Sequence, residues 1–162
     1  MLNTLKVSGE LIKILVVDDD KLIRWSLKEI FSQEGYVVDA VATAKDALKQ
    51  AKNITYELIF SDLEINDENG IEMLKNAKVL QPDAKIIILS ALTKQQIEPK
   101  LGNLSIFSII EKPFRSEQIK TIVKEALGST NHQNESENPA EKITKEQKLM
   151  SLLSKSKINK TQ

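Results

Sequence analysis

The stretch that decides the fold is "LIKILVVDDDKLIRWSLKEIFSQEG", Leu11–Gly35. It opens with a nearly continuous run of Leu, Ile and Val, which is typical of a strand buried on both faces of a sheet. Three aspartates follow directly, and apolar residues then recur at helical spacing as far as Gly35, a residue that favours the end of a helix. The stretch therefore predicts one β–α unit with acidic residues at the carboxyl end of its strand.

The same order of strand and helix recurs four more times. Short apolar strands that alternate strictly with helices indicate an α/β fold in which helices cover both faces of a parallel sheet. Pro99 interrupts the fourth helix, so we expect that helix to be short and poor. The four further strands are predicted at 36–41, 57–62, 85–91 and 106–112, and their helices at 44–52, 70–80, 93–101 and 116–128.

The composition of the chain changes at Gly128. The residues 129–141 are polar and contain no apolar residue other than Ala, which is typical of a linker. The residues after them can form at most one marginal amphipathic helix. We therefore expect an N-terminal extension over 1–10, one folded domain over 11–128, and a linker with a short tail over 129–162.

The overall composition excludes several classes of function. Lys and Arg together number 23, as do Asp and Glu, so the net charge predicts no direct binding of nucleic acid or of a membrane. The absence of Cys and the single His exclude disulfides and nearly all zinc chemistry. The apolar runs are too short to span a bilayer, and the first ten residues lack the features of a signal peptide. We therefore expect a cytoplasmic protein.

Polar residues of complementary chemistry stand at the carboxyl ends of four predicted strands. Ligands of doubly wound sheets bind outside these strand ends, so we expect the side chains there to converge on one edge of the sheet. The residues are Asp18, Asp19 and Asp20 after the first strand, Asp62 after the third, Ser90 after the fourth and Lys112 after the fifth.

This set of side chains suits phosphoryl chemistry. Clustered carboxylates bind a hard divalent cation such as Mg2+, which cancels repulsion between an acid and an incoming phosphoryl group. Asp62 would be the nucleophile and would form an aspartyl phosphate. Lys112 would supply a compact cation and Ser90 a hydroxyl donor to the phosphoryl oxygens.

Four segments carry a resemblance to a known family. "ILVVDDD", "ELIFSDLEINDENG", "IIILSA" and "IIEKPF" occur in that order and at near-expected separations. Together they resemble the receiver domain of bacterial two-component response regulators, the CheY-like superfamily, over roughly Ile12 to Gly128. The resemblance implies a flavodoxin-like, doubly wound (βα)5 fold with five parallel strands in the order 2-1-3-4-5. The first helix is similar to that of nitrogen-regulator-type receivers.

The resemblance also implies a role for each residue at the strand ends. A receiver takes a phosphoryl group from a sensor histidine kinase or a histidine phosphotransfer protein and then acts on a downstream protein target. It catalyses its own phosphorylation and dephosphorylation but is not a metabolic enzyme. The implied phosphoacceptor is Asp62. The implied metal ligands are Asp18, Asp19, Asp62 and the backbone carbonyl of Glu64. The switch hydroxyl is Ser90, and the lysine is Lys112, followed by a proline that is often cis.

The sequence departs from the family pattern at several positions. Ile65 and Asn66 replace the usual Met-Pro, so we expect the turn to survive with less rigidity. Ile109 replaces the aromatic switch residue, and this change together with Pro99 predicts an unusual output face. Leu92 lies two residues after the switch hydroxyl and cannot orient an attacking water, which predicts slow self-dephosphorylation.

The acidic residues also allow interpretations other than a metal and phosphoryl site. Asp20 is expected to cap the first helix rather than to bind metal. A calcium loop beginning at Asp62 is excluded, because position six of that loop is Asp67 rather than Gly and position twelve is Met73 rather than Glu.

Trp25 falls opposite the apolar face of its helix, and is either a contact for the phosphodonor protein or packs on the N-terminal extension.

Two other classes of function stay open at the level of sequence. One is a phosphorylation-independent pseudo-receiver that serves only as an interaction module, although such proteins usually lose the acid, Ser and Lys set. The other is a Mg2+-dependent hydrolase that uses the same aspartyl nucleophile, although the chain is short for such an enzyme and no cap domain is evident.

Overall fold

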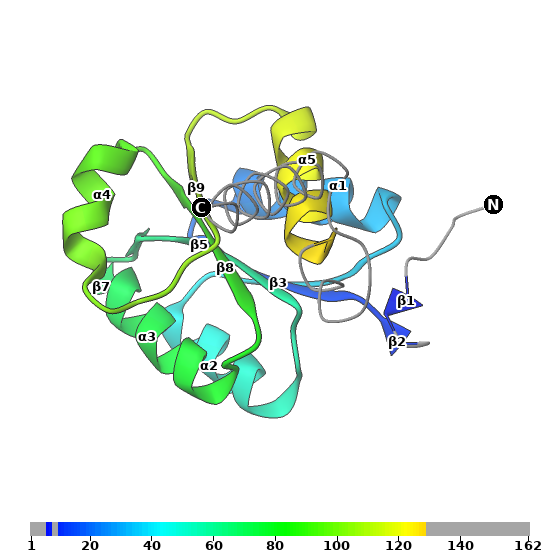
Figure 1. Cartoon of the computed structure of the whole chain (residues 1–162), viewed down its shortest axis with the longest axis horizontal. Helices are drawn as coiled ribbons and strands as arrows, with labels where there is room; N and C mark the ends of the chain where they lie inside the picture. Colours follow the sequence, from blue (N-terminus) through cyan, green and yellow to red (C-terminus); the bar gives the residue numbers. More distant parts are fainter. Residues whose placement is uncertain (1–5, 8–9, 129–162) are drawn as a thin grey trace, which may run out of the picture. The chain divides into compact units, whose positions relative to one another are not determined.

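The computed structural model describes residues 6–7 and 10–128 of the chain, and the fold below is that of the unit within Met1–Ala126. Its centre is one sheet of five parallel strands in the order β4-β3-β5-β8-β9, which confirms the predicted order 2-1-3-4-5 (Figure 1). The expected tail over 129–162 lies outside the described residues. The strands are β3 (Lys13–Val17), β4 (Val37–Val41), β5 (Leu58–Asp62), β8 (Lys85–Ser90) and β9 (Ser108–Glu111).

Five helices alternate with these strands in the described part of the chain. Side chains cap four of them, because Asp20, Thr43, Asn69 and Thr93 each accept a hydrogen bond from a backbone N–H of the first turn. No helix in the described ranges has the length and apolar character needed to cross a membrane. The helices are α1 (Lys21–Gln33), α2 (Ala44–Asn53), α3 (Gly70–Leu80), α4 (Lys94–Leu101) and α5 (Ser116–Gly128).

The fourth helix runs through Pro99, which we expected to interrupt it. α4 keeps eight residues with Pro99 inside. Its first turn is fixed by a complete capping box, in which the Thr93 hydroxyl accepts from Gln96 and the Gln96 side chain accepts from Thr93. Ile97 and Leu101 are buried in the core and hold the helix against the sheet. Capping and burial therefore offset the hydrogen bond that proline removes.

The central strands bury side chains on both faces of the sheet. Along β3, Leu15 and Val17 contribute to the core shared with α2, α3 and α4. The alternate residues Ile14 and Val16 are fully buried as well, so they must point to the other face. On that other face the ring of Phe60 meets the ring of Phe31 of α1 at a centroid distance of 5.0 Å. Figure 1 shows α1 and α5 on one side of the sheet and α2 and α3 on the other.

Two short antiparallel hairpins lie outside the βα pattern and were not predicted. The first joins β1 (Lys6–Val7) and β2 (Glu10–Leu11) ahead of the central sheet. The second joins β6 (Glu64–Ile65) and β7 (Glu68–Asn69) directly after β5. The second hairpin lies next to the predicted site, because it follows Asp62 at the carboxyl edge of the sheet.

Candidate functional site

The parallel register brings four strand ends to the same edge of the sheet. Asp62 is the last residue of β5 and pairs with Leu89, one residue before Ser90 at the end of β8. The backbone N–H of Asp18 donates to the carbonyl of Val41, and that of Lys112 donates to the carbonyl of Ser90. Asp18, Asp62, Ser90 and Lys112 are thus held by the sheet itself or by the first backbone hydrogen bond beyond it.

Three aspartates form a cluster at this edge. Carboxylate oxygens of Asp18, Asp19 and Asp62 all lie within 4.8 Å of one another. Asp18 is 1% exposed, Asp62 is half-buried and Asp19 is exposed. Burial raises the pKa of Asp18, and the hydrogen bond from Lys112 opposes that rise. Three acids with this separation could hold a hard divalent cation through their carboxylate oxygens.

Lys112 connects two of the three acids. Its Nζ atom lies 2.8 Å from Oδ2 of Asp18 and 2.8 Å from Oδ2 of Asp62. Burial lowers the pKa of Lys112, but the hydrogen bonds to the two carboxylates outweigh it and raise the pKa overall. Lys112 therefore stays an ammonium ion at neutral pH. The peptide bond from Lys112 to Pro113 is cis, as the resemblance implied.

Ser90 and Glu64 lie beside this cluster. Ser90 is buried, and its hydroxyl oxygen accepts a hydrogen bond of 3.1 Å from the N–H of Leu92. The N–H of Glu64 donates to Oδ1 of Asp62 over 3.2 Å, while the Glu64 side chain is exposed. The structure thus gives Asp62 two hydrogen bonds, one to each oxygen, from Lys112 and from the backbone of Glu64.

The β6–β7 hairpin adds a residue that the sequence analysis did not assign to the site. Asn66 and Asp67 have φ angles of 48° and 60°, as the two central residues of a type I′ turn require. The N–H of Asn66 donates to Oδ2 of Asp19 over 3.1 Å, and its side-chain amide donates to the carbonyl of Ala42 over 3.1 Å. Asn and Asp both tolerate the positive φ angles of such a turn, but the pair lacks the glycine that marks most two-residue hairpin turns in a sequence.

Glu68 ties the same hairpin to the second helix. Its Oε2 atom accepts a hydrogen bond of 2.9 Å from the N–H of Ala44, the first residue of α2. Glu68 and Asn66 thus join the hairpin to Ala44 and Ala42, the two residues on either side of Thr43 in the connection between β4 and α2. Whether the loop is less rigid than one with Met-Pro stays a prediction, but these bonds anchor it at three points.

Arg24 is a second residue that the sequence analysis did not assign. Its Nη1 atom donates a hydrogen bond of 2.8 Å to the backbone carbonyl of Asp18. Asp20 caps α1 as expected, since its Oδ1 atom accepts from the N–H groups of Leu22 and Ile23. The first turns of α1 therefore hold the backbone of the acidic segment in place.

Two side chains that the sequence analysis singled out as unusual pack against the core, and a third is exposed on α1. Ile109 is half-buried and packs against the hydrophobic core, as does Leu92. Trp25 is 61% exposed on α1, beside Leu22 at 68%. The exposed ring agrees with a side chain that points away from the apolar face of the helix.

Comparison with known proteins gives concordant matches. The model of the response regulator receiver domain matches residues 14–124. Sporulation initiation phosphotransferase F of Bacillus subtilis is 36% identical over 118 residues, which cover 71% of this chain and 93% of that protein. The transcriptional regulator NtrC of Azospirillum brasilense is 30% identical over 116 residues, 72% of this chain but only 24% of the length of that protein.

A solved structure matches in the same region. The receiver domain from Methanospirillum hungatei, described as CheY-like, has a TM-score of 0.72 and 30% sequence identity and covers 77% of this chain and 100% of its own. The family match includes all five strands of the central sheet except the first residue of β3, together with the three clustered aspartates and Lys112. This chain therefore belongs to the response regulator receiver domain family, the signalling domains of two-component systems.

Proposed function

We propose that the chain accepts a phosphoryl group from a phosphohistidine onto Asp62. The observation that carries this proposal is the position of Lys112, whose ammonium group contacts Asp18 and Asp62 at the same time in a cluster of three carboxylates. A lone surface acid would need no such arrangement. The name of the Bacillus subtilis relative, a phosphotransferase, supports the same chemistry.

Asp62 is the nucleophile of the proposed reaction. A carboxylate oxygen of Asp62 forms a bond to phosphorus while the bond from phosphorus to the imidazole nitrogen of the donor breaks, and the imidazole leaves with that electron pair. Lys112 compensates negative charge on the phosphoryl oxygens, because its ammonium group already lies 2.8 Å from Asp62. The Ser90 hydroxyl is buried at the neighbouring strand end and would donate to a phosphoryl oxygen.

The donor set of the site fits Mg2+. Asp18, Asp19 and Asp62 supply hard oxygen ligands within 4.8 Å of one another, and the backbone carbonyl of Glu64 is the proposed fourth protein ligand. When bound, the metal neutralises charge between the acids and the phosphoryl group. Asn66 and Arg24 hold Asp19 and the backbone of Asp18 in place by the hydrogen bonds described above.

Phosphorylation would shift the populations of two conformations and so change a protein–protein surface. The proposed partners are a sensor histidine kinase or a histidine phosphotransfer protein, which donates the group, and a downstream protein target. We place this exchange in the cytoplasm. The chain catalyses its own modification and turns over no metabolite.

The decisive experiment is direct phosphorylation. The protein is incubated with Mg2+ and acetyl phosphate, and intact mass is measured for the wild type and for Asp62→Asn. The expected result is the gain of one phosphoryl group by the wild type alone, as an acid-stable, base-labile adduct that forms only with Mg2+. Absence of the adduct on the wild type would overturn the proposal, as would sustained release of phosphate by the protein in place of a stable adduct.

A further inference from the structure

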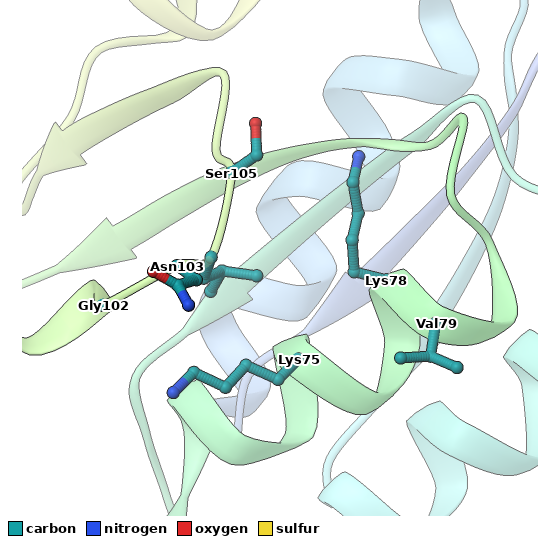
Figure 2. A pocket seen from close by; sticks show the side chains of 7 residues that line it. Lys75, Lys78, Val79, Gly102, Asn103 and Ser105 are labelled. Atoms are coloured by element: carbon teal, nitrogen blue, oxygen red, sulfur yellow. The ribbon is translucent and has the colours of Figure 1, made fainter.

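A lysine-lined cavity separates the third helix from the segment that follows the fourth. It has a volume of about 520 Å3. Figure 2 shows Lys75, Lys78 and Val79 on α3 across from Gly102, Asn103 and Ser105. None of these residues belongs to the aspartate cluster or contacts it through a hydrogen bond described above. The cavity is therefore a separate feature of the surface.

Two further cavities adjoin the first one, because they share its lining residues. Lys75 also lines a cavity of about 590 Å3 with Lys100, and Lys78 and Ser105 also line one of about 350 Å3. The first cavity thus shares Lys75 with one neighbour and Lys78 and Ser105 with the other. We call the three cavities together the lysine groove and define it by Lys75, Lys78, Val79, Lys100, Gly102 and Ser105.

The lysines of the groove form no ion pair in the described part of the chain, although Glu72 and Asp83 line its two outer cavities. Within the described residues, neither Lys75 nor Lys100 forms an ion pair, and Lys78 donates only to the backbone carbonyl of Ala84, over 2.6 Å. Lys94 and Lys120, by contrast, each pair with a glutamate. Unpaired ammonium groups around a concave surface attract anionic groups of a ligand.

Because residue 102 is a glycine, no side chain at that position covers the ammonium group of Lys75 in the lysine groove. Nζ of Lys75 lies 3.7 Å from the position that a Cβ atom of Gly102 would occupy. Gly102 has a φ of 56°, a conformation that residues with a side chain rarely adopt. The ammonium group of Lys75 therefore faces bare backbone, and no side chain at that position covers it.

The groove also has an apolar wall. Val79 is 81% exposed, although it is aliphatic and lies on a helix whose other apolar residues are mostly buried. Leu80 beside it is 40% exposed. A ligand that complements this surface carries negative charges and at least one aliphatic group.

We propose that the lysine groove docks an extended acidic segment of a partner protein, with its carboxylates on Lys75 and Lys100 and an aliphatic side chain on Val79. An extended peptide fits better than a small anion, because the three cavities and the exposed Val79 offer more sites than a small anion can occupy. Nucleic acid fits less well, because it carries a negative charge at every nucleotide and would meet Glu72 and Asp83 in the two outer cavities, whereas a peptide can place uncharged residues beside them.

The test measures binding of a defined probe to the full chain. The probe is a fluorescent synthetic peptide of twelve residues composed of Asp, Glu and Leu, and its counterpart replaces every acid by the corresponding amide. Nitrogen-15 spectra of the protein locate the site, and fluorescence anisotropy gives Kd. Binding is expected for the acidic peptide alone, with the largest shifts at Lys75, Val79 and Gly102–Ser105.

Charge-reversed variants test the lysines that carry the proposal. Lys75→Glu with Lys100→Glu is expected to raise Kd at least about tenfold. The control Lys49→Glu with Lys124→Glu makes the same change in net charge at exposed lysines of α2 and α5, and is expected to change Kd less than about twofold. Val79→Asn tests the apolar wall and is expected to weaken binding while the fold, checked by circular dichroism, is unchanged, since Val79 is exposed.

Several outcomes would overturn the proposal. They are the absence of binding, an equal loss in the two charge-reversed pairs, and shifts that map to a surface away from the groove. Saturable shifts at the groove with inorganic phosphate alone would assign it to a small anion, and tighter binding of single-stranded DNA than of the peptide would assign it to nucleic acid. Peptide binding is measured in the same way on Asp62→Asn, which lacks the proposed phosphoacceptor. Because the lysine groove does not include Asp62, this variant separates the binding proposal from the proposed phosphorylation.

Discussion

The backbone N–H of Asn66 donates a hydrogen bond of 3.1 Å to Oδ2 of Asp19, a residue 47 positions earlier in the chain. Asn66 adopts a φ of 48°, and its side chain donates to the carbonyl of Ala42. A proline, which the family pattern favours near this position, has no N–H to donate and is fixed at a negative φ. The β6–β7 hairpin therefore requires a residue other than proline at position 66. Through the N–H of Asn66, the hairpin holds Asp19, one of the proposed metal ligands.

Replacement of Asn66 by proline is expected to destabilise the protein and to weaken its binding of Mg2+. Loss of the N–H together with an incompatible φ should cost about 2–3 kcal/mol of unfolding free energy. Asn66→Gly is the control, because glycine keeps the N–H and the positive φ and loses only the bond to Ala42. Urea unfolding and calorimetric titration with Mg2+ measure the two effects. Equal behaviour of the two variants would contradict this role for the backbone N–H.

The fold could be predicted from the sequence because its signals are local. Alternation of apolar strands with capped helices identifies the layers, and the carboxyl ends of the strands indicate where Asp18, Asp62, Ser90 and Lys112 must lie. The structure confirms the fold class and the strand order. The spacing of residues in the sequence does not show which atoms meet. The structure shows that the ammonium group of Lys112 contacts both Asp18 and Asp62.

Features built from distant polar contacts could not be predicted in the same way. Gln81 follows the end of a helix, a position from which the sequence suggests an exposed side chain. In the structure it is buried, and its side chain forms hydrogen bonds with the backbone of Tyr56 and Ala51. The hydrogen bond from Asn66 to Asp19 likewise depends on a positive φ and on tertiary packing. The lysine groove arises from the approach of α3 to the residues after α4, and no local pattern encodes it.

Lys112 is expected to stabilise the fold as well as the proposed reaction. In Lys112→Met the carboxylates of Asp18 and Asp62 lose their shared cation, while Asp18 stays buried. This loss should lower the free energy of unfolding by about 2–4 kcal/mol in the absence of Mg2+. Lys94→Met is the matched control. It removes an exposed ion pair with Glu98 and should cost less than about 0.5 kcal/mol. Urea unfolding in EDTA compares the two variants, and a similar cost for both would argue against a structural role for Lys112.

Gly70 permits a close approach of the hairpin to the third helix. A Cβ atom at this position would overlap the backbone carbonyl of Leu63, the group that accepts a 3.0 Å hydrogen bond from the N–H of Gly70. Gly70→Ala must therefore displace the backbone that follows Asp62, at a cost of about 2–4 kcal/mol. Gly128→Ala serves as the control, since no atom of the described residues lies within 4 Å of its Cβ position. Thermal unfolding of both variants checks the difference, and an unchanged Tm for Gly70→Ala would refute the overlap.

Leu92 is expected to lengthen the life of the aspartyl phosphate, if Asp62 is phosphorylated as proposed. Its side chain packs against the hydrophobic core and offers no group that could orient an attacking water. The phosphorylated protein should therefore persist for minutes or longer, and Leu92→Gln should shorten its half-life several-fold. Decay of the adduct is followed by intact mass after the phosphodonor is removed. A half-life of seconds in the wild type would contradict the prediction.

The contact between Tyr56 and Asp39 predicts how stability depends on pH. The Tyr56 hydroxyl donates to Oδ2 of Asp39 over 2.6 Å. Burial, this hydrogen bond and the charge of Asp39 raise the pKa of Tyr56 above its usual value of 10.0. The folded state therefore keeps the proton to a higher pH than the unfolded state does. The stabilisation is complete below pH 10 and is lost as the pH rises above that value.

Tyr56→Phe removes this titration and provides the comparison. At pH 8 the wild type should be more stable than the variant by about 1–3 kcal/mol, because the variant leaves Asp39 without its donor. Above pH 10 the difference should shrink by about 1.4 kcal/mol for each pH unit, because only the wild type then loses a proton on unfolding. Tyr36 is present in both proteins, so its own titration cancels. Urea unfolding at pH 8 and pH 11 measures the difference, and a gap that stays constant would show that Tyr56 titrates alike in the folded and unfolded states.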